Sequence, residues 1–233
     1  MPGQGYHYGI VKRICAMTGE RFNDEMIIGT LVVDALNAAA GSRRASHFTG
    51  GAGCIIPYYT ELRQSTKIQS WDSGWRKSYL VDPKIEMKLF EASNRHLPEG
   101  AYKDGIRFHL ISDRAYDQLV QTKIFDVSRQ KDGIIKVRAT GKEMSGAEFR
   151  SELYKSYPML DAYLLKTSGV TAEDIESAKE LVRSAMNEAH AEFICKYLNF
   201  NSEIEWQDTE FFTKDVIDNM VEETLSTSLE YFL

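Results

Sequence analysis

The sequence has no long hydrophobic run, and no stretch of its 233 residues approaches the roughly 18 apolar residues that a membrane-spanning helix needs. Its N-terminus also lacks the charged and then apolar segment that is typical of a secretory signal peptide. Cysteine is scarce, with three widely scattered residues, so we expect no disulfide framework. These absences predict a cytoplasmic protein without a transmembrane segment.

An excess of positive charge is missing as well. The 28 Lys and Arg residues are outnumbered by 34 Asp and Glu residues, which gives a formal net charge of −6. Stable binding of nucleic acid is therefore not expected, because no basic stripe is available to displace counterions from a phosphate backbone. An enzyme that holds a small phosphorylated substrate through a few local cations is still compatible with this charge.

The hydrophobic pattern predicts an all-α protein with a single multi-helix domain over residues 1–233. Helices are expected at about 6–17, 24–37, 84–93, 98–125 and 208–231. Asn23 has the side chain of a helix cap, and Ser145 and Thr171 begin capping-box patterns. The helix that begins after Thr171 is predicted to be long, because apolar residues keep helical spacing as far as Phe193.

Two segments depart from the helical pattern. Residues from about 40 to 80 contain glycines and aromatic residues without a steady period, and we expect this long irregular segment to be functional or to contain short elements. Residues Ile134–Ala139 alternate weakly and predict a small hairpin arm.

The residues that indicate chemistry are His109 and Asp113, which lie four positions apart in a predicted helix. This spacing places both side chains on one helical face, about 5–6 Å apart at Cβ. Imidazole nitrogen and carboxylate oxygen are suitable ligands for Zn²⁺ and related metals. The pair alone is weakly specific, so its meaning depends on other residues of the same kinds.

Three such residues occur earlier in the chain: His7 in the first predicted helix, Asp34 near the end of the second, and His47 in the following loop. The segments His7-Tyr8, 28–34, Ser46-His47-Phe48 and 109–113 resemble, in order and character, those of the zinc-dependent phospholipase C family. The single-strand-specific zinc nucleases share its general design. The resemblance covers about residues 5–120, and it is looser over 145–231.

The resemblance implies a particular set of ligands in an all-α fold. Asp34, His47, His109 and Asp113 would bind a central metal, and His7 would help to bind a second one with Asp113 as a bridge. The implied cofactor is zinc, as one or two ions, although another divalent metal would suit the same ligands. If the set is correct, the ligating groups must lie within roughly 8 Å of one another, because zinc–ligand bonds measure only about 2.0–2.2 Å.

The leading hypothesis is a metal-dependent hydrolase, acting on a small phosphorylated substrate or a phospholipid headgroup. Asp34 is the candidate general base, and Arg43, Arg44 and Arg114 are the candidate phosphate-binding residues, because guanidinium binds phosphate oxygens bidentately. In an active enzyme the irregular segment should cover the metal pocket, with Arg43, Arg44, Trp71 or Trp75 reaching the cleft. The oligomeric state stays open.

Two alternatives remain. The family carries a later His and a His-x₃-Glu pair for a third metal, whereas only His190 follows Asp113 here, and the residue four further on is Ile194. A non-catalytic helical protein that retains a partial metal site would explain this difference. An HD-type nucleotide phosphohydrolase would also use helical His and Asp ligands, but its adjacent His-Asp pair is absent. We expect His96 to belong to a capping loop and His190 to lie on a solvated helix face.

Overall fold

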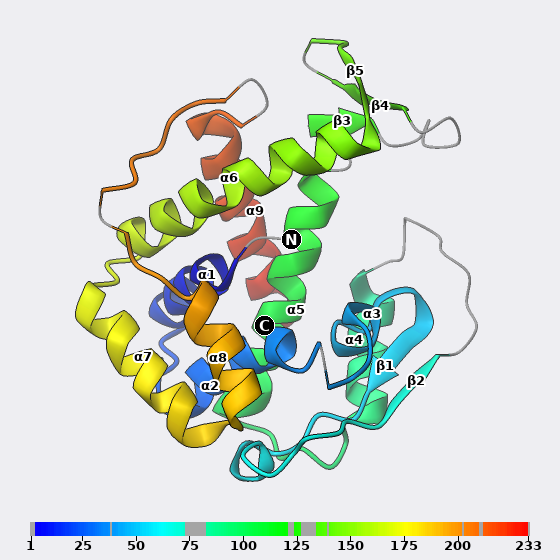
Figure 1. Ribbon diagram of the computed structural model, residues 1–233, viewed down its shortest axis with the longest axis vertical. Helices are drawn as coiled ribbons and strands as arrows, with labels where there is room; N and C mark the ends of the chain where they lie inside the picture. Colours follow the sequence, from blue (N-terminus) through cyan, green and yellow to red (C-terminus); the bar gives the residue numbers. More distant parts are fainter. Residues whose placement is uncertain are drawn as a thin grey trace.

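Helices form most of the protein in the computed structural model (Figure 1), as the all-α prediction requires. The structure describes residues 3–37, 39–72, 83–120, 124–126, 134–138, 140–201, 203–209 and 212–232. Within these ranges the longer helices are α1 (Gln4–Thr18), α2 (Asp24–Ala35), α4 (Pro83–Ser93), α5 (Ala101–Leu119), α6 (Gly146–Thr167), α7 (Ala172–Ala185), α8 (Glu188–Tyr197) and α9 (Lys214–Phe232). The helices predicted at 6–17, 24–37, 84–93, 98–125 and 208–231 are found, with ends shifted by up to six residues, and Phe125 belongs to a strand instead.

The helix starts that were predicted from capping residues are confirmed. The side chain of Asn23 accepts a hydrogen bond from the Met26 amide at the start of α2. Ser145 and Thr171 each form a complete capping box, the first with Glu148 and the second with Asp174. These side chains satisfy backbone N–H groups that have no partner within the first helical turn.

The prediction of one long helix after Thr171 was wrong. Helix α7 ends at Ala185, Met186 adopts an extended conformation, and Asn187 then caps a separate helix α8 by accepting from the His190 amide. Apolar residues happen to keep helical spacing across the break, so the periodicity could not reveal it. The capping side chain of Asn187 was the local signal, because asparagine favours helix starts over helix interiors.

The irregular segment contains several short elements among its described residues. These are α3 (Arg43–Ser46), the 3₁₀ turns Thr49–Gly51 and Tyr59–Glu61, and strands β1 (Ala52–Cys54) and β2 (Ser70–Asp72). The strands pair antiparallel, with Gly53 opposite Trp71. A Cβ atom at residue 53 would overlap the Trp71 ring, so glycine permits this pairing.

A second, three-stranded antiparallel sheet lies beside one end of α6, at the top of Figure 1. It consists of β3 (Phe125–Asp126), β4 (Ile134–Val137) and β5 (Glu143–Ser145). Strand β4 corresponds to the predicted hairpin arm, while Ala139 falls outside the described residues. The first sheet, β1 with β2, packs near α3 and α4 instead.

Helices α1, α2 and α5 contribute to both clusters of buried hydrophobic residues, and they therefore form the centre of the fold. The crossing of α2 and α5 is unusually close because Gly29 and Gly105 meet there. A Cβ atom at Gly29 would overlap the Tyr102 carbonyl oxygen, and one at Gly105 would overlap the Met26 carbonyl oxygen. This close approach brings the carbonyl group of Thr30 against His109, with a separation of 2.7 Å between its oxygen and Nδ1.

Helix α1 is capped by a residue that lies far away in the sequence. Its own cap position is Gly3, which has no side chain, and Asp161 of α6 instead accepts hydrogen bonds from the amides of Gly3 and Tyr6, each at 3.1 Å. This arrangement ties α1 to α6 and fixes the end of α1 that carries His7.

We therefore expect Asp161→Ala to lower the free energy of unfolding by about 1–2 kcal/mol, the usual effect of removing a helix cap. Urea denaturation of both proteins would measure this loss, and Glu180→Ala on the exposed face of α7 is the control. Equal stability of the two variants would contradict the capping role of Asp161.

Among the described residues, no helix combines the length and the apolar character needed to cross a membrane.

Candidate metal centre

Five residues from four parts of the fold meet at the centre of the molecule. His7 comes from α1, Asp34 from the last turn of α2, His47 from the residue after α3, and His109 and Asp113 from α5. All five are buried, with exposed fractions from 0% to 4%. They are the residues that the sequence predicted as metal ligands.

Their ligating atoms are close together. His47 Nε2 lies 3.1 Å from Asp34 Oδ1 and 3.3 Å from Asp113 Oδ2. His109 Nε2 lies 3.5 Å from both His47 Nε2 and Asp113 Oδ2, and His7 Nε2 lies 3.3 Å from Asp113 Oδ1. These distances are far below the 8 Å limit set by the size of a metal site, so the structure brings the predicted ligands together.

The hydrogen bonds made by the other nitrogen of each ring determine the tautomers of the three histidines. His109 Nδ1 donates to the Thr30 carbonyl oxygen at 2.7 Å. Ser112 Oγ donates its proton to the His109 carbonyl at 2.8 Å, so it accepts from His7 Nδ1 at 2.9 Å. His47 Nδ1 donates to the Arg43 carbonyl at 3.0 Å.

In each neutral ring the proton is therefore on Nδ1, and the lone pair of Nε2 faces the cluster. This is the arrangement that metal-binding histidines require, because an outer hydrogen bond fixes the orientation and tautomer of the ring. The stacking of His7 on His109, with ring centroids 3.8 Å apart, restricts the two rings further.

The centre of the cluster holds buried acceptor atoms without hydrogen-bond partners among the described residues. They are His7 Nε2, Asp34 Oδ1 and both carboxylate oxygens of Asp113. Nitrogen lone pairs and carboxylate oxygens that face one another at about 3 Å repel, and burial makes an unpaired carboxylate costly. A shared cation removes both problems, so the residues present fit a divalent metal.

Protonation in the absence of a metal follows the same electrostatics. Burial, together with neighbouring His109, lowers the pKa of His7 to about 4, and burial also lowers the pKa of His47. Burial would lower the pKa of His109 too, but the adjacent carboxylate of Asp113, with Asp34 nearby, outweighs this effect and raises it. A proton on His109 can thus offset part of the negative charge of the two carboxylates.

The two carboxylates remain ionised. Burial raises the pKa of a carboxyl group, but at Asp34 the adjacent His47 and the charges of His109 and Arg43 outweigh it, and the pKa falls well below its usual range. At Asp113 the histidines His7 and His109 have the same effect. A carboxylate with so low a pKa is better suited to bind a metal than to act as a general base.

Two overlapping groups have the mutual separations of a metal site among the described residues: His7 with Asp34 and His109, and His47 with His109 and Asp113. His109 belongs to both. The resemblance implied a different division, in which His7 and Asp113 would contribute to a second metal, and their 3.3 Å contact is compatible with that division as well.

Sequence reasoning missed several residues that support the site. Gln4 donates from Nε2 to Asp34 Oδ2 at 2.5 Å, and Ser112 orients His7 as described above. Both lie at helical spacing from a ligand, Gln4 three positions before His7 and Ser112 three after His109. Asp117 extends the His109-Asp113 face by one more turn, and burial with the nearby charge of Asp113 raises its pKa to about 6.

The three arginines predicted to bind phosphate lie in different surroundings. Arg43 Nη2 is 3.5 Å from Asp34 Oδ1 and 3.9 Å from Asp113 Oδ2, so Arg43 lies directly beside the cluster. Arg44 instead pairs with Asp72 at 3.5 Å, and the Arg114 guanidinium pairs with Glu86 of α4. The structure thus brings only the first of the three into contact with the metal ligands.

The irregular segment reaches the cluster through Arg43 and His47. Trp71 packs instead on Gly53 of the neighbouring strand, and Trp75 lies outside the described residues.

A pocket of about 460 Å³ adjoins the centre on the side of Asp34. The residues that line it include Asp34, Asn37, Thr66, Asn187, His190 and Phe193. His190 was expected on a solvated face, and this prediction was wrong: its exposed fraction is 5%, because the start of α8 packs against α2. The pocket therefore connects α8 with the candidate metal centre.

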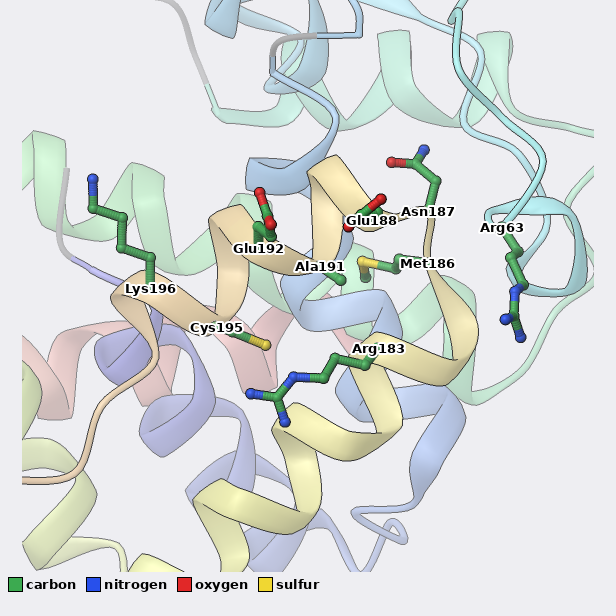
Figure 2. A pocket seen from close by; sticks show the side chains of 9 residues that line it. All are labelled: Arg63, Arg183, Met186, Asn187, Glu188, Ala191, Glu192, Cys195 and Lys196. Carbon is green, nitrogen blue, oxygen red and sulfur yellow. The ribbon is translucent and has the colours of Figure 1, made fainter.

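Another pocket, of about 720 Å³, lies between α7, α8 and Arg63 (Figure 2). Its charged side chains have mixed signs, and Figure 2 shows Glu188 and Glu192 on one side of α8 with Arg183 on the other. None of the five predicted ligands lines this pocket. The chemistry therefore points to the buried cluster and its adjoining pocket.

Comparisons of the chain with models of protein families, with curated proteins and with solved structures found no match. The likeness to the zinc-dependent phospholipase C family thus rests on the four sequence segments, and the function must be argued from the geometry of the cluster.

Proposed function

We propose that this protein is a metal-dependent hydrolase that acts on a phosphoester. The observation that carries the proposal is the common direction of three Nε2 lone pairs and two carboxylates toward one buried point. Each histidine has its outer nitrogen engaged by an oxygen of the protein. Such an arrangement is costly without a cation and is well suited to zinc or a similar divalent metal.

The residues around the metal position have separate roles in this proposal. His7, Asp34, His47, His109 and Asp113 hold one or two metal ions. A bound divalent metal supplies a water activated at neutral pH and stabilises negative charge that develops on a phosphate. Gln4 holds Asp34 in place through Oδ2, which leaves Oδ1 free to face the cluster. Its low pKa makes Asp34 better suited to the role of ligand than to that of the general base that the sequence predicted.

Arg43 is the residue best placed to bind the phosphate. Its side chain is 41% exposed, yet its Nη2 atom is buried beside Asp34 and has no hydrogen-bond partner among the described residues. It therefore extends from solvent to the metal ligands, and a planar guanidinium can bind two phosphate oxygens at once. A small phosphorylated molecule or a phospholipid headgroup could be held in this way.

We expect Arg43→Ala to lower kcat/KM for a phosphoester by about 100-fold, the usual scale for removing one charge-stabilising donor at a reaction centre. Arg44→Ala is the matched control, because it removes the adjacent arginine, which pairs with Asp72 on the surface. Metal content should be unchanged in both variants. Equal activity of the two variants would contradict the phosphate-binding role of Arg43.

The proposal as a whole is tested by assays of phosphodiester and phosphomonoester hydrolysis in the presence of added Zn²⁺ or Mn²⁺. The alternative is a non-catalytic helical protein with a metal site, and the deep burial of all five ligands favours it. Tightly bound metal without turnover of any phosphoester would support this alternative. Absence of bound metal would contradict both functions.

A further inference from the structure

His190 differs from the three candidate metal ligands in the way its ring is held. Asn187 caps α8 through Oδ1, which accepts from the His190 amide at 3.1 Å. Its other side-chain atom, Nδ2, consequently faces both the Ser65 carbonyl at 2.8 Å and His190 Nδ1 at 2.9 Å. An amide nitrogen can only donate, so His190 Nδ1 accepts this hydrogen bond.

The proton of the neutral His190 ring is therefore on Nε2, the reverse of the tautomer found at His7, His47 and His109. Nε2 has no hydrogen-bond partner among the described residues. It is also not fully buried, so a ligand in the pocket that His190 lines can reach it. Burial lowers the pKa of His190, which keeps the ring neutral near pH 7. The ring thus offers an N–H donor where the metal ligands offer lone pairs.

The pocket beside His190 has the properties of a site for an uncharged group. Its volume of about 460 Å³ lies toward the small end of ligand sites. Asn37, Thr66 and His190 provide polar groups, and Phe193, 38% exposed, provides a ring surface. No lysine or arginine occurs among the described residues that line it, so a phosphate would be held by Arg43 and the metal rather than here.

We propose that this pocket binds the leaving group of the phosphoester, an uncharged sugar or base with hydroxyl and carbonyl oxygens, and that His190 Nε2–H donates a hydrogen bond to it. This inference rests on the proposed function, since Asp34 lines the pocket and also belongs to the candidate metal centre. His190 is then a specificity-determining residue, and Asn187 positions it by fixing its tautomer.

The first test is the tautomer itself, which does not depend on activity. Long-range ¹H–¹⁵N correlation spectra of the metal-loaded protein should show protonated Nε2 and unprotonated Nδ1 at His190. Addition of uridine 5′-monophosphate should move these resonances, whereas phenyl phosphate, whose ring has no hydroxyl or carbonyl oxygen besides the ester oxygen, should not. A proton on Nδ1, or equal responses to the two compounds, would overturn the proposal.

The second test compares hydrolysis of the same two compounds. One neutral hydrogen bond corresponds to about a 3- to 10-fold preference, so His190→Phe should lower kcat/KM for uridine 5′-monophosphate by this factor relative to phenyl phosphate. His190→Gln keeps an N–H donor and should lose less. Asn187→Asp keeps the helix cap but places an acceptor against Nδ1, and it should lose as much as His190→Phe.

Failure of this inference can be distinguished from failure of the hydrolase proposal. If the wild-type protein turns over both compounds but the variants lose activity on both equally, the leaving-group assignment is wrong and the hydrolase stands. If the wild-type protein turns over neither of these monoesters nor any phosphodiester, the hydrolase proposal fails, and the titration decides alone. Movement of the His190 resonances with uridine 5′-monophosphate only would then support the pocket assignment, and no movement would overturn it.

Discussion

Replacing His109 by alanine is expected to abolish tight metal binding and to lower the melting temperature of the metal-saturated protein by about 5–15 °C. His109 is the residue common to both groups of candidate ligands. A metal present at 100 to 1,000 times its dissociation constant stabilises the folded state by about 3–4 kcal/mol, and each kcal/mol corresponds to roughly 2–4 °C in a protein of this size.

Elemental analysis and thermal denaturation with and without a chelator would measure both effects. The wild-type protein should lose stability when a chelator is added, whereas His109→Ala should not respond. His96→Ala is the control, because His96 is exposed and its ring meets the Ile56 carbonyl, at 2.8 Å, rather than the cluster. A wild-type melting temperature that ignores the chelator would exclude a structural metal at this centre.

Gly29→Ala is expected to lower the free energy of unfolding by about 3 kcal/mol and to weaken metal binding at the same time. The added methyl group would overlap the Tyr102 carbonyl oxygen, which belongs to the backbone and cannot rotate away. Helices α2 and α5 must then separate, at a cost near the upper end of that for overpacking a core. The separation also withdraws Thr30 from His109 and Asp34 from the cluster.

Denaturant titration and competition for zinc with a coloured chelator would measure the two effects. Gly146→Ala is the matched control, because the nearest atom to a Cβ there is the end of the Arg150 side chain at 3.7 Å. Its stability should stay within about 0.5 kcal/mol of wild type. A stable Gly29→Ala protein with normal zinc affinity would show that the close crossing of α2 and α5 does not position the site.

The identity of the candidate ligands could be read from the sequence because two kinds of local information agreed. The spacing of His109 and Asp113 places them on one helical face, and the segments around His7, Asp34 and His47 resemble those of the zinc-dependent phospholipase C family. The helix starts at Asn23, Ser145 and Thr171 were equally readable, since a capping side chain acts within its own first turn.

The break between α7 and α8 and the burial of His190 could not be read in the same way. Hydrophobic periodicity indicates which residues share a helix face. It does not indicate whether the chain turns between two helices, such as α7 and α8, whose apolar residues continue the same spacing. His190 has polar neighbours in the sequence, and it lines a pocket because α8 packs on α2.

The sequence by itself determined the helical class, the helix starts and the set of side chains able to bind a metal, because each of these depends on residues within a few turns. The tertiary structure decided which nitrogen of each histidine faces the cluster, since the deciding partner is often on another element. His109 is oriented by Thr30 of α2, and His47, which follows α3, meets Asp34 of α2. The tertiary structure also decided that Arg43, rather than Arg44 or Arg114, lies beside the ligands. The Arg43 guanidinium reaches the buried Asp34 carboxylate because α3 packs against α2, and local spacing in the sequence does not show this packing.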